Sequence, residues 1–168
     1  MNEERLILGI DPGYGRAGYA IVAAHGSALH LIACDTIITP QGLVYPERLQ
    51  QLYEELREVI THYCPKEAAI EKLFFGKNAP TAIAVAQARG VTLLALVQSS
   101  IPIAEYTPNE VKLAVTGYGA ATKGQVGDMV RLLLHLSAIP RPDDSADAAA
   151  IAICHAHTLR VPAMHTPR

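Results

Sequence analysis

The stretch Leu6-Ile-Leu-Gly-Ile-Asp11-Pro-Gly13 decides how this sequence folds. An uninterrupted run of apolar and small residues predicts a buried strand, and the proline and glycine after it predict a turn. Asp11 therefore ends a strand that is otherwise apolar. Because an unpaired charge is costly to bury, we expect Asp11 to have a charged partner at this edge of the sheet.

Three more acidic residues occur in the same kind of setting. Glu71 ends the segment Ala68-Ala-Ile-Glu71, and Asp144 and Asp147 precede the apolar run 148–153. A separation of three positions at the start of a helix puts the side chains of Asp144 and Asp147 on one face, where they can share a ligand. Acidic residues are also common as caps at helix N-termini, so this pair alone leaves a purely structural interpretation open.

Carboxylates at strand and helix ends predict a site for divalent metal ions. Ligand sets made only of oxygen suit Mg²⁺ or Mn²⁺. In sites with two ions, the ions lie about 3.5–4 Å apart and stabilise the attacking and leaving oxygens of a phosphoryl transfer. The reaction class that this pattern indicates is metal-assisted hydrolysis of a phosphodiester.

Length and composition restrict the class of protein. The 168 residues, of which 50% are hydrophobic and 18% charged, fit one globular domain over residues 1–158, with 159–168 as a loose tail. The three cysteines are widely spaced, which predicts reduced thiols and a cytoplasmic location. The longest apolar stretch, 79–97, is interrupted by Gln87, Arg89 and Gly90, so we expect neither a signal peptide nor a membrane span.

Charge is distributed unevenly along the chain. The formal net charge is −2, yet residues 72–131 carry six lysine and arginine residues against three acids, a net charge of +3. Residues 46–67 carry five acids against three bases. The basic segment predicts a surface for a polyanion such as nucleic acid, although scattered surface charge would produce the same count.

Hydrophobic periodicity predicts an α/β fold. Three apolar runs separated by short turns predict an antiparallel meander, and the segments after it alternate between helical and strand patterns. Thr107-Pro-Asn-Glu110 and Thr122-Lys-Gly-Gln125 match capping boxes, so each begins a helix. With the first strand in the centre of a mixed sheet, Asp11 lies beside Glu71. The expected strands are 5–11, 17–24, 28–38, 68–71 and 102–106, and the other expected helices are 46–63, 79–98 and 143–158.

Six segments form an ordered set of motifs over nearly the whole chain: Ile7-Leu-Gly-Ile-Asp-Pro-Gly13, Ala69-Ile-Glu-Lys-Leu-Phe-Phe-Gly-Lys-Asn78, Gln87-Ala-Arg-Gly90, Glu110-Val-Lys112, Lys123-Gly-Gln-Val126 and Asp144-Ser-Ala-Asp-Ala-Ala-Ala-Ile-Ala-Ile153. Together they resemble the motifs of the RuvC family of bacterial Holliday-junction resolvases. The resemblance implies a ribonuclease-H-like fold, a mixed five-stranded sheet flanked by helices. It also implies a homodimer that nicks a four-way DNA junction symmetrically in recombination and repair.

The resemblance implies the composition of the active site as well. Its catalytic and metal-binding residues fall on Asp11, Glu71, Asp144 and Asp147, which would hold Mg²⁺, with two ions per site and Mn²⁺ as a substitute. Asp144 is preferred to its neighbour Asp143 because only Asp144 keeps the three-residue spacing to Asp147. A motor complex that drives branch migration of the junction is the expected working partner.

Four residues are candidates for DNA binding. Phe74 lies with Lys77 on a basic, glycine-containing segment, where an aromatic ring can stack on bases or insert between them. A ring at such a position can equally anchor the segment in the core, and we assign Phe74 to DNA and Phe75 to packing. Lys112 and Lys123 are expected to contact phosphates near the cleaved bond, the alternative being ordinary surface lysines.

Two other features have competing interpretations. Helix 79–98 is rich in small and branched apolar residues, which is typical of a core helix, although in the family this helix contributes to the dimer interface. His155 and His157 are two positions apart on a helix, so they face different directions. We interpret them as core or surface histidines and not as zinc ligands.

Two other functions are compatible with parts of the sequence. The pattern Gly-Ile-Asp-x-Gly after a strand also begins sugar-kinase and actin-like ATPase modules, but these need a second, similar domain that 168 residues do not accommodate. The other alternative is a catalytically idle nucleic-acid-binding scaffold of the same fold. The presence of all four acids argues against it.

Overall fold

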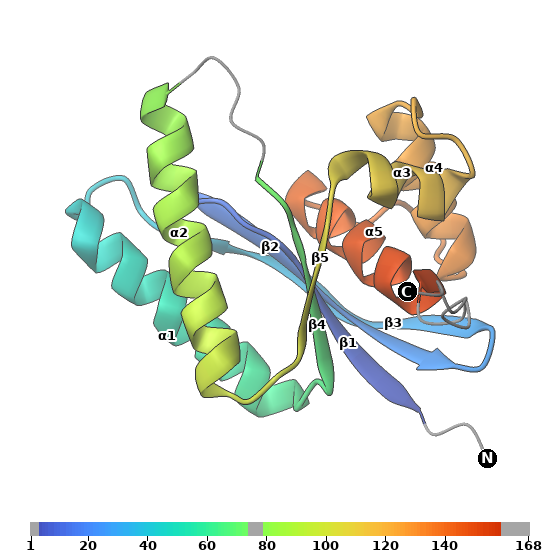
Figure 1. The fold of residues 1–168 in the computed structure, drawn as a ribbon, viewed down its shortest axis with the longest axis horizontal. Coiled ribbons are helices and arrows are strands. Elements are labelled where there is room, and N and C mark those ends of the chain that lie inside the picture. Colours follow the sequence, from blue (N-terminus) through green and yellow to red (C-terminus); the bar gives the residue numbers. More distant parts are fainter. Residues whose placement is uncertain (1–3, 74–78, 159–168) are drawn as a thin grey trace, which may run out of the picture.

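A mixed five-stranded sheet lies at the centre of the protein, with helices on both faces (Figure 1). The computed structural model describes residues 4–73 and 79–158. Its elements are β1 (Arg5–Asp11), β2 (Arg16–His25), β3 (Ala28–Ile38), α1 (Tyr45–Tyr63), β4 (Glu67–Glu71), α2 (Ala79–Gln98), β5 (Ile103–Tyr106), α3 (Pro108–Thr116), α4 (Lys123–Leu133) and α5 (Asp143–Thr158). The predicted α/β fold is confirmed, and the predicted strand and helix bounds differ by no more than one residue at either end.

The strand order β3-β2-β1-β4-β5 places β1 in the middle of the sheet. The first three strands form the predicted antiparallel meander, and β4 and β5 add to the sheet in parallel. In the parallel ladder Ile10 is the partner of Ile70, so the following residues, Asp11 and Glu71, lie side by side at one edge. The predicted neighbourhood of these two acids is confirmed.

Two separate hydrophobic cores cover the two faces of the sheet. The first core packs α1 and α2 against one face, with Leu52, Leu56 and Ile60 of α1 buried at a spacing of four residues. The second core packs α3, α4 and α5 against the other face. Figure 1 shows the α1/α2 layer and the α3–α5 layer on opposite sides of the sheet.

Local signals set where α3 and α4 begin. The Thr107 hydroxyl accepts a hydrogen bond from the Glu110 backbone N–H, and the Glu110 carboxylate accepts one from the Thr107 N–H. Thr122 and Gln125 make the same reciprocal pair at the start of α4. Both predicted capping boxes are therefore confirmed.

Helix α5 approaches the sheet very closely because two strand positions are glycine. A Cβ atom on Gly9 would lie 2.1 Å from the carbonyl oxygen of Ala148, and one on Gly18 would lie 2.0 Å from that of Asp144. Only glycine leaves room for a helix backbone at these distances. The first turns of α5 are thereby held over β1 and β2, near the strand ends that carry the acids.

Two segments that carry sequence predictions are not described by the structure. Phe74, Phe75 and Lys77, and the expected tail at 159–168, lie outside the described residues. Within residues 4–73 and 79–158, no helix is long and apolar enough to cross a membrane.

Candidate active site

Three of the four predicted acids converge on one cavity of about 310 Å³. Asp11 comes from the end of β1, Glu71 from the end of β4, and Asp147 from the first turns of α5. Lys112 of α3 and Lys123 of α4 line the same cavity. The remaining wall is mostly apolar and consists of Pro108, Val111, Val126, Ala150 and Ile151.

The alternation of side chains along the strands aims both strand-end acids at this cavity. In β4, Ala68 and Ile70 belong to the core on the α1/α2 side, and Ala69 belongs to the core on the α5 side. Glu71, two residues after Ala69, therefore faces α5. The same alternation in β1 puts Asp11 on the α5 face as well, because Ile10 faces the α1/α2 core.

The carboxylates in this cavity are crowded. Burial and the negative charges of Asp147, Glu71 and Asp144 together raise the pKa of Asp11 to about 7, against the opposing charge of Lys123. Burial and the charge of Asp147 also raise the pKa of Glu71. The site therefore carries more negative charge than its own cations compensate.

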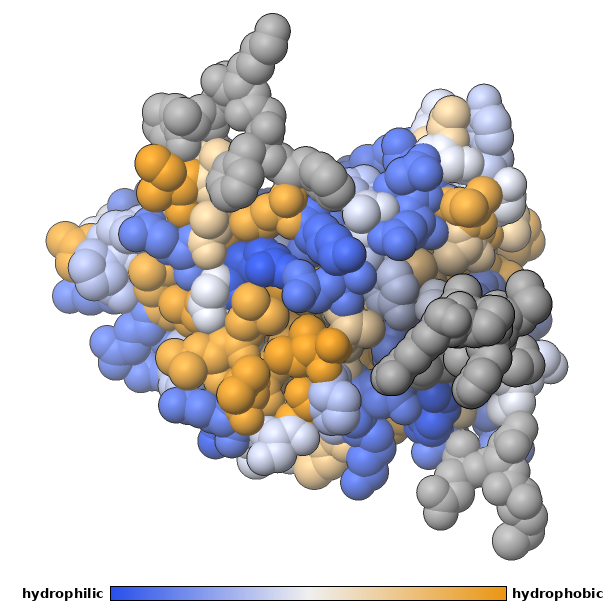
Figure 2. All heavy atoms as spheres, viewed as in Figure 1, coloured by the Kyte–Doolittle hydropathy of each residue, from blue (hydrophilic) through white to orange (hydrophobic). Residues whose placement is uncertain are grey.

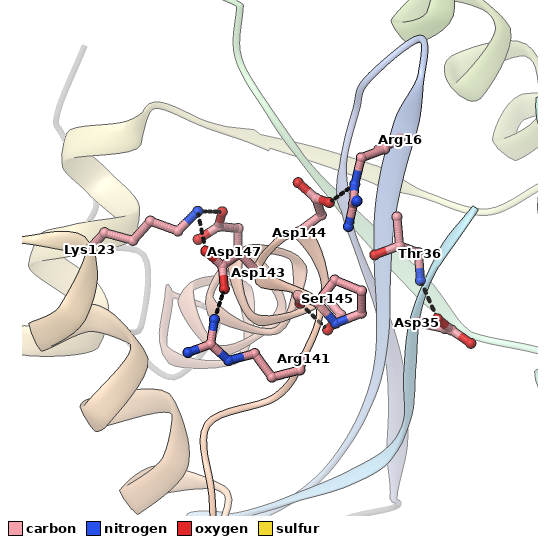
Figure 3. Close-up of polar contacts among 10 residues, drawn as sticks. Arg16, Asp35, Thr36, Lys123, Arg141, Asp143, Asp144, Ser145 and Asp147 are labelled. Atoms are coloured by element: carbon pink, nitrogen blue, oxygen red, sulfur yellow. Dashed lines mark hydrogen bonds and ion pairs between the residues drawn. The ribbon is translucent and has the colours of Figure 1, made fainter. Parts of the chain in front are cut away.

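Lys123 lies against this negative charge. Its Nζ atom is 2.8 Å from Oδ2 of Asp147 and 3.8 Å from Oδ2 of Asp143 (Figure 3). The hydrogen bond to Asp147 raises the pKa of the Lys123 ammonium. An ammonium held in this way remains charged and can be offered to a phosphate oxygen that enters the cavity.

Asp144, the fourth predicted acid, is turned toward a different partner. Its Oδ2 atom accepts a hydrogen bond from Nε of Arg16 at 2.7 Å, and Asp144 is not among the residues that line the cavity (Figure 3). Its charge still contributes to the raised pKa of Asp11, so it lies close to the cluster. Arg16 was not among the residues predicted for the site. Its position directly after the turn that follows Asp11 is the sequence signal that could have indicated a cation near the acids.

Asp143 has surroundings of its own. Its carboxylate pairs with the guanidinium of Arg141, and the two residues line a smaller neighbouring cavity of about 190 Å³. Lys123 and Asp147 line both cavities. Asp143 therefore belongs to the rim of the site and not to the group of acids that faces Asp11 and Glu71.

The chemistry of the donor set fits a divalent cation. Within residues 4–73 and 79–158, no three His, Cys, Asp or Glu side chains are already grouped tightly enough to hold a metal ion. Two of the four carboxylates are instead engaged by Arg16 and Lys123. Burial and the charges of neighbouring acids raise the pKa values of Asp11 and Glu71, so a cation here would stabilise their ionised forms. Carboxylate oxygens are the ligands that Mg²⁺ and Mn²⁺ prefer.

Comparison with known proteins adds independent information. Residues 7–155 match the model of the family "Crossover junction endodeoxyribonuclease RuvC". A protein of that name from Chloroflexus aggregans is 56% identical over 151 residues, which cover 90% of this chain and 92% of the relative. One from Thermotoga maritima is 51% identical over 150 residues, 89% of each chain.

Solved structures agree with the sequence relatives. Thermus thermophilus RuvC in complex with a Holliday junction substrate superposes with a TM-score of 0.88 at 34% identity, covering 93% of this chain and 95% of the other. The yeast mitochondrial Holliday junction resolvase shares the fold, with a TM-score of 0.62 at 15% identity over 90% of this chain and 78% of the other.

Proposed function

Because the chain belongs to the RuvC family of crossover junction endodeoxyribonucleases, we propose that it resolves four-way DNA junctions by hydrolysing one phosphodiester bond in each of two strands. The observation that carries this proposal is the convergence of Asp11, Glu71 and Asp147 on a cavity that also contains Lys112 and Lys123. Acids and bases in one open cavity suit a substrate that is a polyanion and a reaction that needs a cation.

The three cavity acids and Asp144 are the residues that would hold the metal ions. When bound, two Mg²⁺ ions, or Mn²⁺ in their place, would polarise the scissile phosphate and stabilise the charge on the attacking and leaving oxygens. The carboxylates would fix the position of these charges, and a cation beside Asp11 would return its pKa toward the ordinary range of a carboxyl group. Asp144 would have to turn from Arg16 to join the set.

The two lysines would bind phosphates of the DNA backbone near the cleaved bond. Lys112 lies in the middle of α3 and Lys123 is the first residue of α4, and both line the cavity described above. Phosphate contacts of this kind orient the strand without reading its sequence. From the family resemblance we extend the set of DNA-binding residues to Phe74 and Lys77.

We also propose that the protein acts in the cytoplasm. There it would work together with a motor complex that drives branch migration of the junction.

Helix α2 supports a homodimer. Its residues Ile83, Gln87, Gly90, Leu94 and Val97 are all exposed and follow each other at alternating steps of four and three residues. The side chains of Ile83, Leu94 and Val97 are 60%, 51% and 64% exposed, and Figure 2 shows an apolar patch over α2. This spacing is that of a seam between two helices.

We propose that the seam pairs with the same seam of a second copy, because a junction presents two equivalent strands and each chain has one acid cluster. The native mass should be close to twice 18.0 kDa, and Leu94→Glu should lower it to that of one chain. A monomeric wild-type protein that still makes paired, symmetric nicks would contradict the dimer.

An end-labelled four-way junction tests the proposed activity directly, beside a linear duplex of matching sequence. With Mg²⁺ we expect symmetric nicks in the junction, ends that a ligase alone can seal, and little cutting of the duplex. With EDTA we expect binding without nicks. Binding without nicks in both conditions would instead indicate the catalytically idle scaffold, and equal cutting of both substrates would contradict junction selectivity.

A further inference from the structure

Four polar side chains form a hydrogen-bonded chain between α5 and the sheet, at the end of α5 remote from the acids. We call Arg5, Glu67, Tyr106 and His155 the polar clamp. The Tyr106 hydroxyl lies 2.8 Å from Nδ1 of His155, and Nε2 of His155 lies 2.9 Å from Oε2 of Glu67. Arg5 Nη1 donates to Oε1 of Glu67 at 3.1 Å. Tyr106 and His155 are buried, so the centre of the clamp is shielded from water.

One arrangement of protons satisfies the imidazole of His155 on both sides. A neutral ring donates its Nε2–H to the Glu67 carboxylate and accepts the Tyr106 O–H at Nδ1. Burial lowers the pKa of His155, which favours the neutral ring, although the charge of Glu67 opposes this shift. A buried imidazole that is hydrogen-bonded on both sides requires one relative position of the elements that carry its partners.

Both β4 and α5 carry one residue of the polar clamp and one residue of the acid cluster, at similar separations along the element. On β4, Glu67 and Glu71 lie on one face, and their four-residue separation spans about 13 Å of strand. On α5, His155 and Asp147 lie on one face, and their eight-residue separation spans about 12 Å of helix. The contact of His155 with Glu67 at one end therefore matches the approach of Asp147 to Glu71 at the other.

Something has to hold Asp147 in place, because the acids repel one another. Asp11, Glu71 and Asp147 line one cavity, so three carboxylates of like charge lie close together. The glycine contacts of α5 at Gly9 and Gly18 allow the helix to come close to the sheet, but they have no directional bond that fixes its height along the strands. Hydrogen bonds with defined lengths and angles supply this restraint.

We propose that the polar clamp positions the acid cluster by holding α5 at a fixed height along β4, so that Asp147 stays beside Glu71 and Asp11. None of the four clamp residues lines the active-site cavity, so they are positioning residues and act through α5. The proposal rests on the proposed function of the acids in metal binding and nicking, and its test separates the two.

The test compares clamp variants with a matched control. Tyr106→Phe removes one hydrogen bond from the clamp, and Glu67→Ala removes its centre, whereas Glu67→Gln keeps an acceptor for the imidazole N–H. Ile60→Val is the control, because Ile60 is buried in the core on the α1/α2 side and does not contact α5. For each full-length variant we would measure unfolding by denaturant, Mn²⁺ affinity by the signal of free Mn²⁺ in electron paramagnetic resonance, junction affinity in EDTA, and single-turnover nicking in Mg²⁺.

We expect Tyr106→Phe and Glu67→Ala to weaken Mn²⁺ binding by about tenfold. Mutation of residues that orient the metal ligands has effects of this size at other metal sites. Single-turnover nicking should fall by roughly ten- to a hundredfold, because a small displacement of one reacting group has effects of that size. Glu67→Gln should retain most of both quantities. Junction affinity in EDTA should not change in any of these variants. Ile60→Val should keep normal Mn²⁺ affinity and nicking, even where its free energy of unfolding equals that of Tyr106→Phe.

Equal losses in Tyr106→Phe and in Ile60→Val at equal stability would overturn the positioning role and leave a purely structural one. Unchanged Mn²⁺ affinity in both Tyr106→Phe and Glu67→Ala would overturn it as well. Failure of the proposed function would give a different result. Asp147→Asn would then nick junctions at the same rate as the wild-type protein.

Discussion

The two layers that cover the sheet differ in what they bury. The α1/α2 layer buries large apolar side chains, among them Leu8, Ile10, Leu52, Leu56 and Leu96. The α3–α5 layer packs α5 closely through glycine and alanine and places acids, lysines and the polar clamp around it. Large side chains stabilise the sheet from one face, whereas close packing and polar contacts on the other face hold charges near each other. Changes on the two faces should therefore separate stability from activity.

The largest expected effect is on the α5 face. Asp11→Asn, Glu71→Gln and Asp147→Asn should each lower nicking on the order of 10³-fold, because each removes a charged metal ligand at nearly constant shape. Asp144→Asn should do the same if Asp144 leaves Arg16 to join the site. The measurement is single-turnover cleavage of a labelled junction in Mg²⁺, with junction binding measured separately and expected to be retained.

Asp143→Asn is the matched control for these variants, because Asp143 pairs with Arg141 at the rim of the site. It should nick junctions at close to the wild-type rate. Near-wild-type nicking by any of the other acid variants would remove that residue from the site.

A change on the α1/α2 face should lower stability and leave nicking nearly unchanged. Leu56 is 1% exposed, so Leu56→Ala should lower the free energy of unfolding by about 2–5 kcal/mol through lost burial and a residual cavity. Nicking per folded molecule should remain close to wild type at low temperature. Denaturant unfolding and single-turnover cleavage on the same samples check this, and a loss of nicking larger than the unfolded fraction explains would break the division between the faces.

The third prediction uses pH. The pKa of Asp11 is about 7 in the folded, metal-free protein and near 3.8 in an unconstrained carboxyl group, so the folded state binds a proton more tightly. This contribution to stability is complete below pH 3.8 and is lost as the pH rises through about 7. Between pH 5 and pH 8, Asp11→Asn should therefore lose less stability than the wild-type protein does, as measured by denaturant unfolding in EDTA.

Added Mg²⁺ should stabilise the wild-type protein more at pH 8 than at pH 5, since the ion and the proton compete for the same carboxylates. An identical pH dependence of stability in Asp11→Asn and in the wild-type protein would show that Asp11 is not the residue that responds.

The smallest expected effect concerns the lysines. Lys112→Ala and Lys123→Ala should each remove one phosphate contact and reduce the slope of log K against log salt concentration by about 0.9. Junction affinity measured over a range of salt concentrations, in EDTA, gives this slope. Lys66→Ala, at an exposed position before β4, is the control, and slopes unchanged in both cavity lysines would make them ordinary surface residues.

Local sequence patterns account for much of the fold and for part of the site. The apolar runs and the capping boxes at Thr107 and Thr122 predicted where the elements begin and end. The placement of Asp11 and Glu71 at adjacent strand ends also followed from the sequence, because a parallel pair of strands brings like ends together. These predictions succeed because hydrogen bonding, turn geometry and side-chain alternation act over a few residues.

Only the tertiary structure decided how the charged groups pair across the chain. Arg16 and Asp144 are 128 positions apart and Glu67 and His155 are 88 apart, and no local pattern relates the members of either pair. Their contacts depend on how α5 lies over the sheet, where Gly9 and Gly18 permit its close approach. The sequence by itself determined which residue types stand at the ends of which elements. Packing between those elements determined that Asp147 faces Asp11 while Asp144 turns to Arg16, because a contact between distant segments is a property of how whole elements fit together.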